Sequence, residues 1–472
     1  MVALWWCVAL LIAADQDRRP KLLKPTENQV NWQRLELTTF HHFGVNTYTN
    51  REWGLGDEDP NIFQPDKLDV DQWMKPLAEA GFKQAILTAK HHDGFMLFPS
   101  KFSNHSVASS SWRNGKGDVV RDFFAACRKN AIQPAIYLSP WDRNQYNMTW
   151  KPSYNEFYAK TLEEITTNYG PFNMLWFDGA NAVSGRESLY DWKRWISIIR
   201  KNQPQVIAGG CGIDPPDYFG CAPDASWIGN EAGLAGESTW AVHLAAREFR
   251  LQNESLAYDP FFCDVSIRSG WFYHKYQQPK SLEHLVHIYF NSVGRNCVLQ
   301  LNIPPSPHGL LDEADVRRVM EFGQFLKDFY ATDVATSASV FVSSELSNHR
   351  AQNMLDPNLD LFWEPEEFDT LPCIELGLQE ETIANVLMLQ ENIRGGQAIA
   401  AFQLYGATVS RPYFHLANST TVGEKRLLIF PTTKLIAIKV VFTETLYGYS
   451  PQISRIGLLR TFLTGFDNAA FE

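Results

Sequence analysis

Two acids that each follow a short apolar run are the residues most able to do chemistry. Asp178 lies in the motif Trp176–Ala180 (WFDGA), and Glu231 ends the motif Ser226–Glu231 (SWIGNE). An acid at the end of a buried parallel strand faces the side of a barrel where active sites are built. Two carboxylates about 5 Å apart serve retaining glycosidases as nucleophile and acid/base. The structural alternative for Asp178 is a cap on the following turn or helix.

Two pairs of adjacent histidines, His41-His42 and His91-His92, form the second group. Neighbouring residues of a strand point to opposite faces, so only one histidine of each pair needs to face a pocket. Together with Asp93 and Asp178 they would suit zinc, but neither H-x-H nor H-E-x-x-H spacing is present. Neutral imidazoles that hydrogen-bond sugar hydroxyls fit better, and buried core histidines are the structural alternative. We expect no metal and no cofactor.

Strand and helix patterns alternate from about Leu35 to Phe329 and would position these residues. Such alternation over roughly 300 residues predicts an α/β fold of the (β/α)8-like, TIM-type barrel class, placed at residues 20–335. Asp118 is the expected N-cap of one helix. The expected strands are Leu37–Val45, Gln84–His91, Pro134–Pro140, Asn173–Gly179, Gln205–Gly210 and Cys297–Ile303. The expected helices are Val119–Ala131, Tyr154–Tyr169, Ser188–Asn202 and Ser281–Val293.

The pattern changes near Thr332–Ser337, after which the residues alternate in strand fashion between turn signals such as Gly395-Gly396. We expect a C-terminal antiparallel β-sandwich at residues 338–472. It would be either a glycan-binding module or a structural lid on the barrel. The expected strands are Val340–Val342, Ala398–Tyr405, Lys425–Phe430, Leu435–Phe442 and Ile453–Leu459.

Composition narrows the class of partner. The 472 residues carry a net charge of −11 without a basic cluster, which argues against nucleic acid and anionic membranes. The 15 Trp, 17 Tyr and 31 Phe supply candidate stacking platforms for sugars. Nothing in the sequence indicates an oligomeric state.

The first 14 residues (MVALWWCVALLIAA) are apolar and end in small residues, which predicts a signal peptide cleaved near Ala14. The run is shorter than the roughly 20 residues that span a bilayer, and an apolar tail or anchor is the alternative. Sequons at Asn104, Asn147, Asn253 and Asn418 also favour the secretory pathway. We therefore expect a secreted or lysosomal glycoprotein.

The cysteines divide into two kinds. Cys211 and Cys221 flank a polar loop and are the expected disulfide pair. Cys127, Cys263 and Cys297 lie in apolar stretches and are expected to be buried thiols. No C-x-x-C pair is present, which argues against a structural zinc site.

At this point the motifs resemble those of glycoside hydrolase family 29, the α-L-fucosidases. The similarity extends from about Trp32 to Leu310, and its later blocks resemble the plant-like and bacterial branch, which favours α-1,3- and α-1,4-linked fucose. The residues 421–428 resemble that branch's galactose-binding-like sandwich. The matching blocks are Phe40–Thr47, Glu52–Gly54, Lys90–Phe95, Tyr137–Asp142, Trp176–Ala180, Trp227–Gly233, Cys263–Arg268 and Asn291–Cys297.

This resemblance implies a retaining enzyme that releases fucose from oligosaccharides or glycoproteins. Asp178 would be the nucleophile and Glu231 the acid/base, with Glu237 as the rival for the second role. Arg268 would orient a carboxylate or face the rest of the glycan. The residues that match the fucose pocket are His42, Glu52, Trp53, His91, His92, Tyr137 and Trp176.

Two departures from the family pattern concern the leaving-group side. Family members usually carry Glu before the Cys-Asp-Val-Ser-Ile-Arg block, where this chain has Phe261-Phe262, and the segment Ala208–Asp224 is longer and contains cysteines. Neither departure removes a catalytic carboxylate. The competing hypotheses are an inactive, lectin-like fucose-binding protein, and a metal-dependent hydrolase that a chelator would inactivate.

Overall fold

The computed structural model describes residues 20–145, 148, 151–179, 190–210, 223–242 and 258–462. One compact unit is built on residues 26–332 and a second on residues 333–460, which the N-terminal residues 20–25 join. The sequence had placed residues 20–25 with the barrel. No helix in the described ranges is long and apolar enough to cross a membrane.

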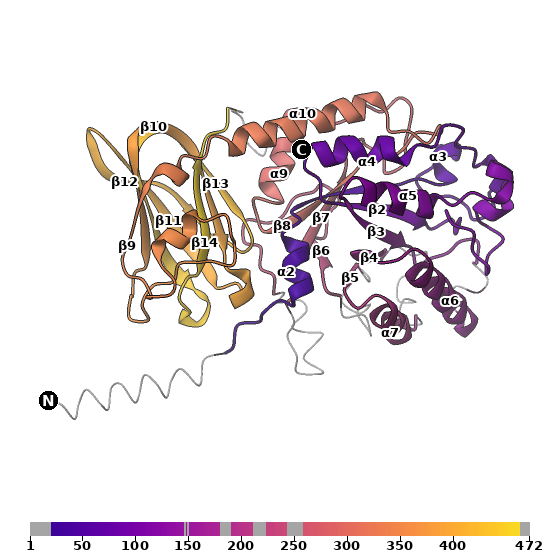
Figure 1. The fold of residues 1–472 in the computed structure, drawn as a ribbon, viewed down its shortest axis with the longest axis horizontal. Helices are drawn as coiled ribbons and strands as arrows, with labels where there is room; N and C mark the ends of the chain where they lie inside the picture. The colour runs from indigo at the N-terminus through magenta and orange to yellow at the C-terminus, as the bar shows by residue number, and fades with distance from the viewer. Residues whose placement is uncertain are drawn as a thin grey trace. The chain divides into compact units, whose positions relative to one another are not determined.

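Eight parallel strands form the sheet of the first unit, in the order β5-β4-β3-β2-β1-β8-β7-β6. An isolated parallel bridge between Gly209 and Ala225 links the two edge strands, so the sheet closes into a nearly complete barrel (Figure 1). This confirms the expected (β/α)8-like class. The strands are β1 (Leu37–His41), β2 (Gln84–Lys90), β3 (Gln133–Leu138), β4 (Met174–Phe177), β5 (Ile207–Gly210), β6 (Ser226–Trp227), β7 (Phe261–Ser266) and β8 (Cys297–Asn302).

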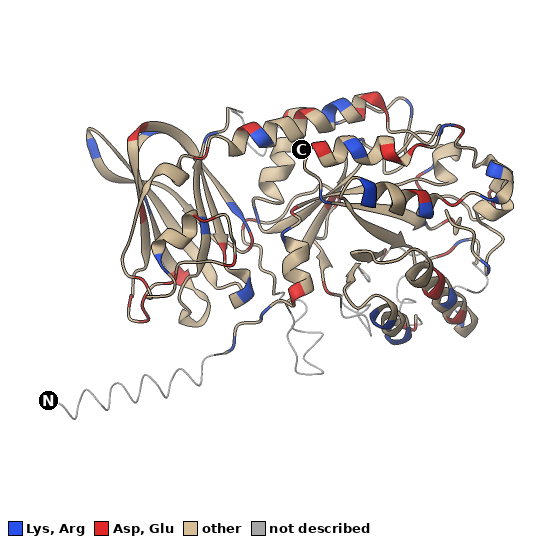
Figure 2. Ribbon diagram, in the orientation of Figure 1, with Lys and Arg blue, Asp and Glu red and all other residues tan. Residues whose placement is uncertain are grey.

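Helices pack against the outer face of this sheet and against one another (Figure 1). Acidic and basic residues are interspersed along α6 and α10 (Figure 2). The helices are α2 (Glu27–Gln33), α3 (Asn46–Thr49), α4 (Val70–Glu79), α5 (Val119–Lys129), α6 (Pro152–Asn168), α7 (Trp192–Asn202), α9 (Leu282–Asn291) and α10 (Glu313–Tyr330).

Helix α5 shows how local sequence sets an element. The Asp118 side chain accepts the backbone N–H of Arg121 and caps the helix as expected. The helix buries Phe123, Phe124 and Cys127 against the barrel. It ends two residues earlier than expected because Ala131 adopts a left-handed backbone, with φ of 55°. Cys127 is a buried free thiol, as expected.

One prediction about the cysteines is wrong. Cys263 and Cys297 are buried but form a disulfide, with their Cα atoms 6.1 Å apart. The bond joins β7 to β8, which pair with Phe261 opposite Cys297. Local apolar character correctly indicated burial, whereas the pairing depends on the register of two distant strands. The signal peptide, the sequons at Asn147 and Asn253, and the Cys211–Cys221 pair lie outside the described residues.

The second unit is an antiparallel sheet that bends into the expected two-layered sandwich. Its strand order is β12-β11-β13-β10-β14, with β9 paired to β10. The first half of β10 pairs with β9 and with the second half of β13, whereas its second half pairs with β14 and the first half of β13. Register breaks after Gly377 and Ala384 separate the halves. The strands are β9 (Ser339–Val342), β10 (Cys373–Glu391), β11 (Ile399–Thr408), β12 (Arg411–Ser419), β13 (Arg426–Thr445) and β14 (Ile453–Leu459).

A single apolar core fills the space between the two layers. Ile374 and Ile438 reach it from one layer, and Leu389 and Leu458 from the other. Strands β10 and β12 were not expected, and the two strands expected between residues 425 and 442 are parts of β13. The sandwich class is therefore right, and Ile453–Leu459 is predicted with its observed bounds, whereas two strands were missed and β13 was divided in two.

Candidate active site

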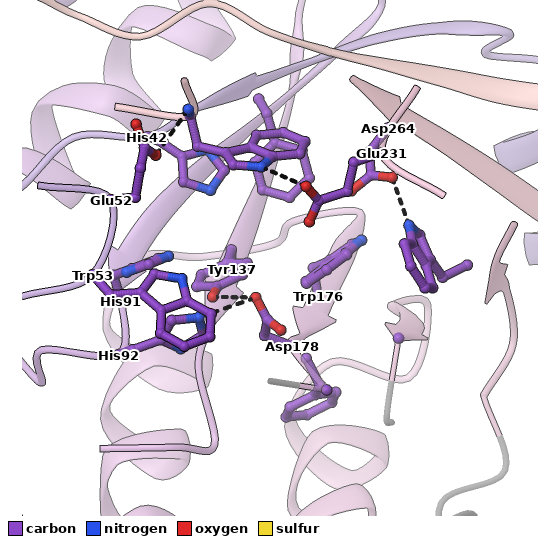
Figure 3. A pocket seen from close by; sticks show the side chains of 16 residues that line it. His42, Glu52, Trp53, His91, His92, Tyr137, Trp176, Asp178, Glu231 and Asp264 are labelled. Atoms are coloured by element: carbon purple, nitrogen blue, oxygen red, sulfur yellow. Dashed lines mark hydrogen bonds and ion pairs between the residues drawn. The ribbon is translucent and has the colours of Figure 1, made fainter. Parts of the chain in front are cut away.

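Residues at the carboxyl ends of the barrel strands surround a cavity of about 340 Å³. This volume lies within the range of small-molecule sites. Figure 3 shows the carboxylates of Asp178 and Glu231 both directed toward the cavity. The lining residues are Phe40, His42, Glu52, Trp53, His91, His92, Tyr137, Trp176, Phe177, Asp178, Gly179, Gly210, Trp227, Glu231, Asp264 and Trp271.

Asp178 follows the last residue of β4 and is held by a phenol from the neighbouring strand. Tyr137 donates its hydroxyl to Asp178 Oδ2 at 2.7 Å (Figure 3). Burial, together with the negative charge of Asp178, raises the pKa of Tyr137 well above its ordinary value. The phenol therefore keeps its proton and remains a donor to the carboxylate. This arrangement orients the carboxylate of Asp178 toward the cavity.

His42 presents one defined nitrogen to the cavity. Asn302 donates its amide hydrogens to Ser266 Oγ and to the Trp271 carbonyl, both at 2.8 Å, so its Oδ1 is an acceptor. His42 Nδ1 must therefore donate to this oxygen, at 2.9 Å. Burial lowers the pKa of His42 to about 4, so the ring is neutral at neutral pH. Its Nε2 is left as a hydrogen-bond acceptor.

His92 is also neutral and also presents Nε2 as an acceptor, although its Nδ1 has a different partner. Ser139 donates its hydroxyl to the Trp141 carbonyl at 2.8 Å, so it accepts from His92 Nδ1, also at 2.8 Å. Burial lowers the pKa of His92 to about 4, and its Nε2 lies 3.6 Å from Asp178 Oδ2. A substrate hydroxyl could donate to either of these acceptors.

The two histidine pairs differ in how many of their side chains face the cavity. His41 points away from the cavity, where its ring contacts Thr39 Oγ1 and the Ile303 carbonyl. Both His91 and His92 line the cavity, because β2 ends at Lys90 and strand alternation stops there. Burial also lowers the pKa of His91 well below its ordinary value. The described residues contain no group of three or more His, Cys, Asp or Glu able to hold a metal.

Aromatic rings form the walls and the rim. Trp176 stacks on Tyr137 with ring centroids 5.2 Å apart. Trp53 is half exposed and packs edge-on against His92 and Trp141, each at 5.3 Å. Such faces suit the apolar side of a sugar ring.

Glu231 and Glu52 are linked through a loop after β7. The indole Nε1–H of Trp271 donates to Glu231 Oε2 at 3.1 Å. Glu52 Oε2 accepts the backbone N–H groups of Trp271 and Phe272, at 2.9 and 3.2 Å. Glu52 Oε1 lies 2.5 Å from His274 Nε2. Glu52 therefore lines the cavity and also fixes the loop that carries Trp271.

Asp264 adds a buried acid that the sequence analysis did not select. It lies in β7 and accepts the indole N–H of Trp227 at 2.6 Å. Burial, reinforced by the charges of Glu231 and Asp178, raises the pKa of Asp264 to about 8. This carboxyl is therefore largely protonated at neutral pH.

Two residues named from the sequence lie elsewhere. Arg268 does not line the cavity: its guanidinium is buried, donates to both oxygens of Asp315 at 2.8 and 3.0 Å, and donates to the Gln277 carbonyl. Its predicted contact with the glycan is not supported by this position. It does orient a carboxylate, but one that anchors a loop. Glu237 is exposed, is not among the lining residues and acts electrostatically on Arg295.

The sequence did contain a signal for Asp264 and Trp271, the two cavity residues that the sequence analysis missed. Asp264 lies inside the block Cys263–Arg268, and Trp271 follows that block by three positions. Both come at the end of a strand that was not recognised as one. Once β7 is known, its carboxyl end must face the same cavity as the ends of β1 and β4.

A nearly closed parallel barrel whose strand ends gather carboxylates, neutral histidines and aromatic rings has the architecture of a carbohydrate-active hydrolase. Residues 22–330 match the family model described as Alpha-L-fucosidase. The chain belongs to this family, glycoside hydrolase family 29, and is a glycoside hydrolase of the α-L-fucosidase class.

Individual relatives agree with this assignment. Alpha-L-fucosidase 1 of Arabidopsis thaliana is 38% identical over 93% of this chain and 88% of its own length. Tissue alpha-L-fucosidase of Mus musculus is 25% identical over 63% of each chain. A Ruminococcus gnavus GH29 fucosidase, solved in complex with fucose, has a TM-score of 0.84 and 32% identity, covering 94% of this chain and 96% of its own.

Proposed function

We propose that the chain hydrolyses terminal α-L-fucose by double displacement, with Asp178 as nucleophile and Glu231 as acid/base. The observation that carries this proposal is the placement of both carboxylates on one cavity, with Tyr137 donating to Asp178. A carboxylate held by a neutral donor is ready to attack an anomeric carbon.

In the first step an oxygen of Asp178 forms a bond to the anomeric carbon while the glycosidic C–O bond breaks. Glu231 gives its proton to the departing oxygen. In the second step Glu231 takes a proton from water, whose oxygen attacks the same carbon and releases Asp178. Fucose leaves with its anomeric configuration retained.

The neutral histidines support recognition of a polyhydroxylated ring. The unprotonated Nε2 atoms of His42 and His92 accept hydrogen bonds from sugar hydroxyls. The indole faces of Trp53 and Trp176 contact the apolar side of the ring and its methyl group. His91, Tyr137 and Glu52 complete the pocket, as the resemblance implies.

We further propose α-1,3- or α-1,4-linked fucose on oligosaccharides or glycoproteins as the substrate, because the sequence blocks resemble the plant-like branch. The Phe261-Phe262 departure lies in β7, where Phe262 is fully buried and packs 5.6 Å from Trp176. An apolar side chain at this position supports the pocket wall and makes no polar contact with the leaving group.

The same proposal includes entry into the secretory pathway, cleavage of the leader and glycosylation. The Cys263–Cys297 disulfide supports it, because such bonds persist in oxidising compartments. Asn104 and Asn418 are exposed, as a glycan acceptor must be. N-terminal sequencing of the secreted protein, which should begin near Asp15, tests cleavage; an N-terminus at Met1 would contradict it.

The decisive test measures fucose released from α-1,2-, α-1,3-, α-1,4- and α-1,6-fucosylated oligosaccharides by wild type, Asp178→Asn and Glu231→Gln. We expect release by wild type from the α-1,3 and α-1,4 substrates and loss in both variants. Release from other linkages alone would contradict the proposed specificity. No release by wild type from any linkage, with fucose binding intact, would favour the lectin-like alternative.

A further inference from the structure

Two backbone hydrogen bonds and one ring contact fix the position of Trp271 beside Glu231. Its backbone N–H donates to Glu52 Oε2 at 2.9 Å, and its carbonyl accepts from Asn302 Nδ2 at 2.8 Å. Its ring packs against His42 with centroids 5.0 Å apart. The indole N–H therefore has a fixed position and direction.

This N–H donates to Oε2 of Glu231, at 3.1 Å. Glu231 itself is exposed and follows a loop in which Gly229 has a φ of 96°. A glutamate in such a setting has several rotamers, and ordering its side chain costs free energy. A hydrogen bond from a fixed partner reduces that cost at the moment of reaction.

An indole nitrogen can only donate a hydrogen bond. The carbonyl oxygen of a protonated carboxyl is a better acceptor than its hydroxyl oxygen, so this bond favours the form of Glu231 in which Oε2 carries no proton. When Glu231 is protonated, its proton resides on Oε1. The indole thus selects the oxygen that carries the proton to the leaving group.

Another of the tryptophans that line the cavity, Trp227, provides a comparison. Trp227 donates its indole N–H to Asp264, and Trp271 donates to Glu231. Each of these acids has its own fixed donor, so the two tryptophans are not interchangeable. Loss of the Trp271 donor would affect Glu231 and leave the Trp227–Asp264 bond in place.

We propose that Trp271 is the positioning residue of the acid/base: it directs the proton of Glu231 to Oε1, and Glu52 holds it in place through the backbone of the loop. This rests on the role of Glu231 proposed above. Trp271 acts through Glu231, so its removal should matter most when the leaving group needs a proton.

The test compares kcat/KM for a fucosyl disaccharide with that for 4-nitrophenyl α-L-fucoside, whose leaving group departs without protonation. Trp271→Phe keeps an aromatic ring and removes the donor. We expect this variant to lower kcat/KM for the disaccharide roughly tenfold more than it lowers kcat/KM for the aryl fucoside. Glu231→Gln should show the same selectivity with a larger loss on the disaccharide, about 10²- to 10⁴-fold.

The double variant separates positioning from packing. If Trp271 acts through Glu231, adding Trp271→Phe to Glu231→Gln causes little further loss on the disaccharide. Tyr273→Phe is the matched control, because it removes the Tyr273–Asp312 hydrogen bond from the same loop. We expect no selectivity between the two substrates in this control.

The results distinguish the proposed acid/base role of Glu231 from the proposed positioning role of Trp271. If Glu231→Gln does not discriminate between the substrates, Glu231 is not the acid/base and the role of Trp271 falls with it. If Glu231→Gln discriminates but Trp271→Phe affects both substrates equally, or its effect adds fully in the double variant, only the role of Trp271 is overturned.

Discussion

The barrel and the sandwich each bury a carboxylate, and the two groups have different surroundings. Glu391 in the sandwich accepts three backbone N–H groups, from Ala398, Ile399 and Gly423, at 2.6 to 3.0 Å. Asp264 in the barrel accepts the indole N–H of Trp227 and lies close enough to Glu231 and Asp178 for their charges to raise its pKa.

Burial raises the pKa of both acids, to about 7 for Glu391 and about 8 for Asp264. A raised pKa therefore does not by itself identify a functional group. The donors make the distinction: Glu391 joins the ends of three strands, whereas Asp264 shares a cavity with other acids. Substitutions should affect stability in the first case and chemistry or pH dependence in the second.

The largest effect is expected for Glu391→Gln in the sandwich. A glutamine can keep its oxygen toward Ala398 and Ile399, but its amide nitrogen then faces the Gly423 N–H, which should lower the free energy of unfolding by about 4 kcal/mol. Glu380→Gln, an exposed position in the same strand, should change it by less than about 0.5 kcal/mol. Urea denaturation measures both, and equal stability of the two variants would contradict the role of Glu391.

Cys263→Ser tests stability within the barrel. The disulfide closes a separation of 34 residues, and its loss should cost about 3 kcal/mol. Cys373→Ser, which removes a free half-buried thiol, is the control. Thermal unfolding with and without a reductant should show a larger fall of Tm in wild type than in the Cys263→Ser variant. A wild-type Tm indifferent to the reductant would argue against the bond.

Tyr137→Phe should act on chemistry. Removal of the donor to Asp178 should lower kcat/KM about 30-fold, equivalent to roughly 2 kcal/mol. The control is Tyr158→Phe, which removes a buried hydroxyl bonded to the Leu138 carbonyl outside the cavity. It should leave kcat/KM of the folded enzyme unchanged. Similar losses in both variants would mean that the effect of Tyr137 is structural.

Asp264→Asn should change how the stability of the protein depends on pH. The pKa of Asp264 is raised from 3.8 to about 8 on folding, so the native state holds an extra proton between these values. Wild type therefore loses stability as the pH rises through this range, and the neutral amide does not. The Tm of the variant relative to wild type should increase from about pH 5 to about pH 9. A difference that is constant with pH would contradict the shift.

The smallest effect is expected from a chelator. Activity after incubation with EDTA and gel filtration should equal that of untreated enzyme. Inactivation reversed by zinc would favour the metal-dependent alternative and would assign the histidines a different role.

Local sequence predicted the barrel well where a strand is continuously apolar and ends in a chemically distinct residue. Asp178 after β4 is the best example. It failed where geometry is set by distant partners: the Cys263–Cys297 bond depends on the register of β7 and β8. Trp271 was missed because it lies in a loop without periodicity.

The errors in the sandwich have a different physical cause. The polar residues Gln379–Glu381 interrupt the alternation within β10, so no strand was predicted where the chain continues as one bent strand. A bulge changes which side chains face the core without ending the ladder. Sequence patterns detect the change of face and cannot distinguish it from a strand end.

The sharing of β10 and β13 between both layers of the sandwich has a mechanical consequence. Two sheets joined only by loops can separate while each keeps its own hydrogen bonds. Here, separation of the layers would require two continuous strands to straighten and would expose the single core between them. The amide hydrogens of both halves of β10 should therefore exchange with solvent together, in one opening event, as one foldon.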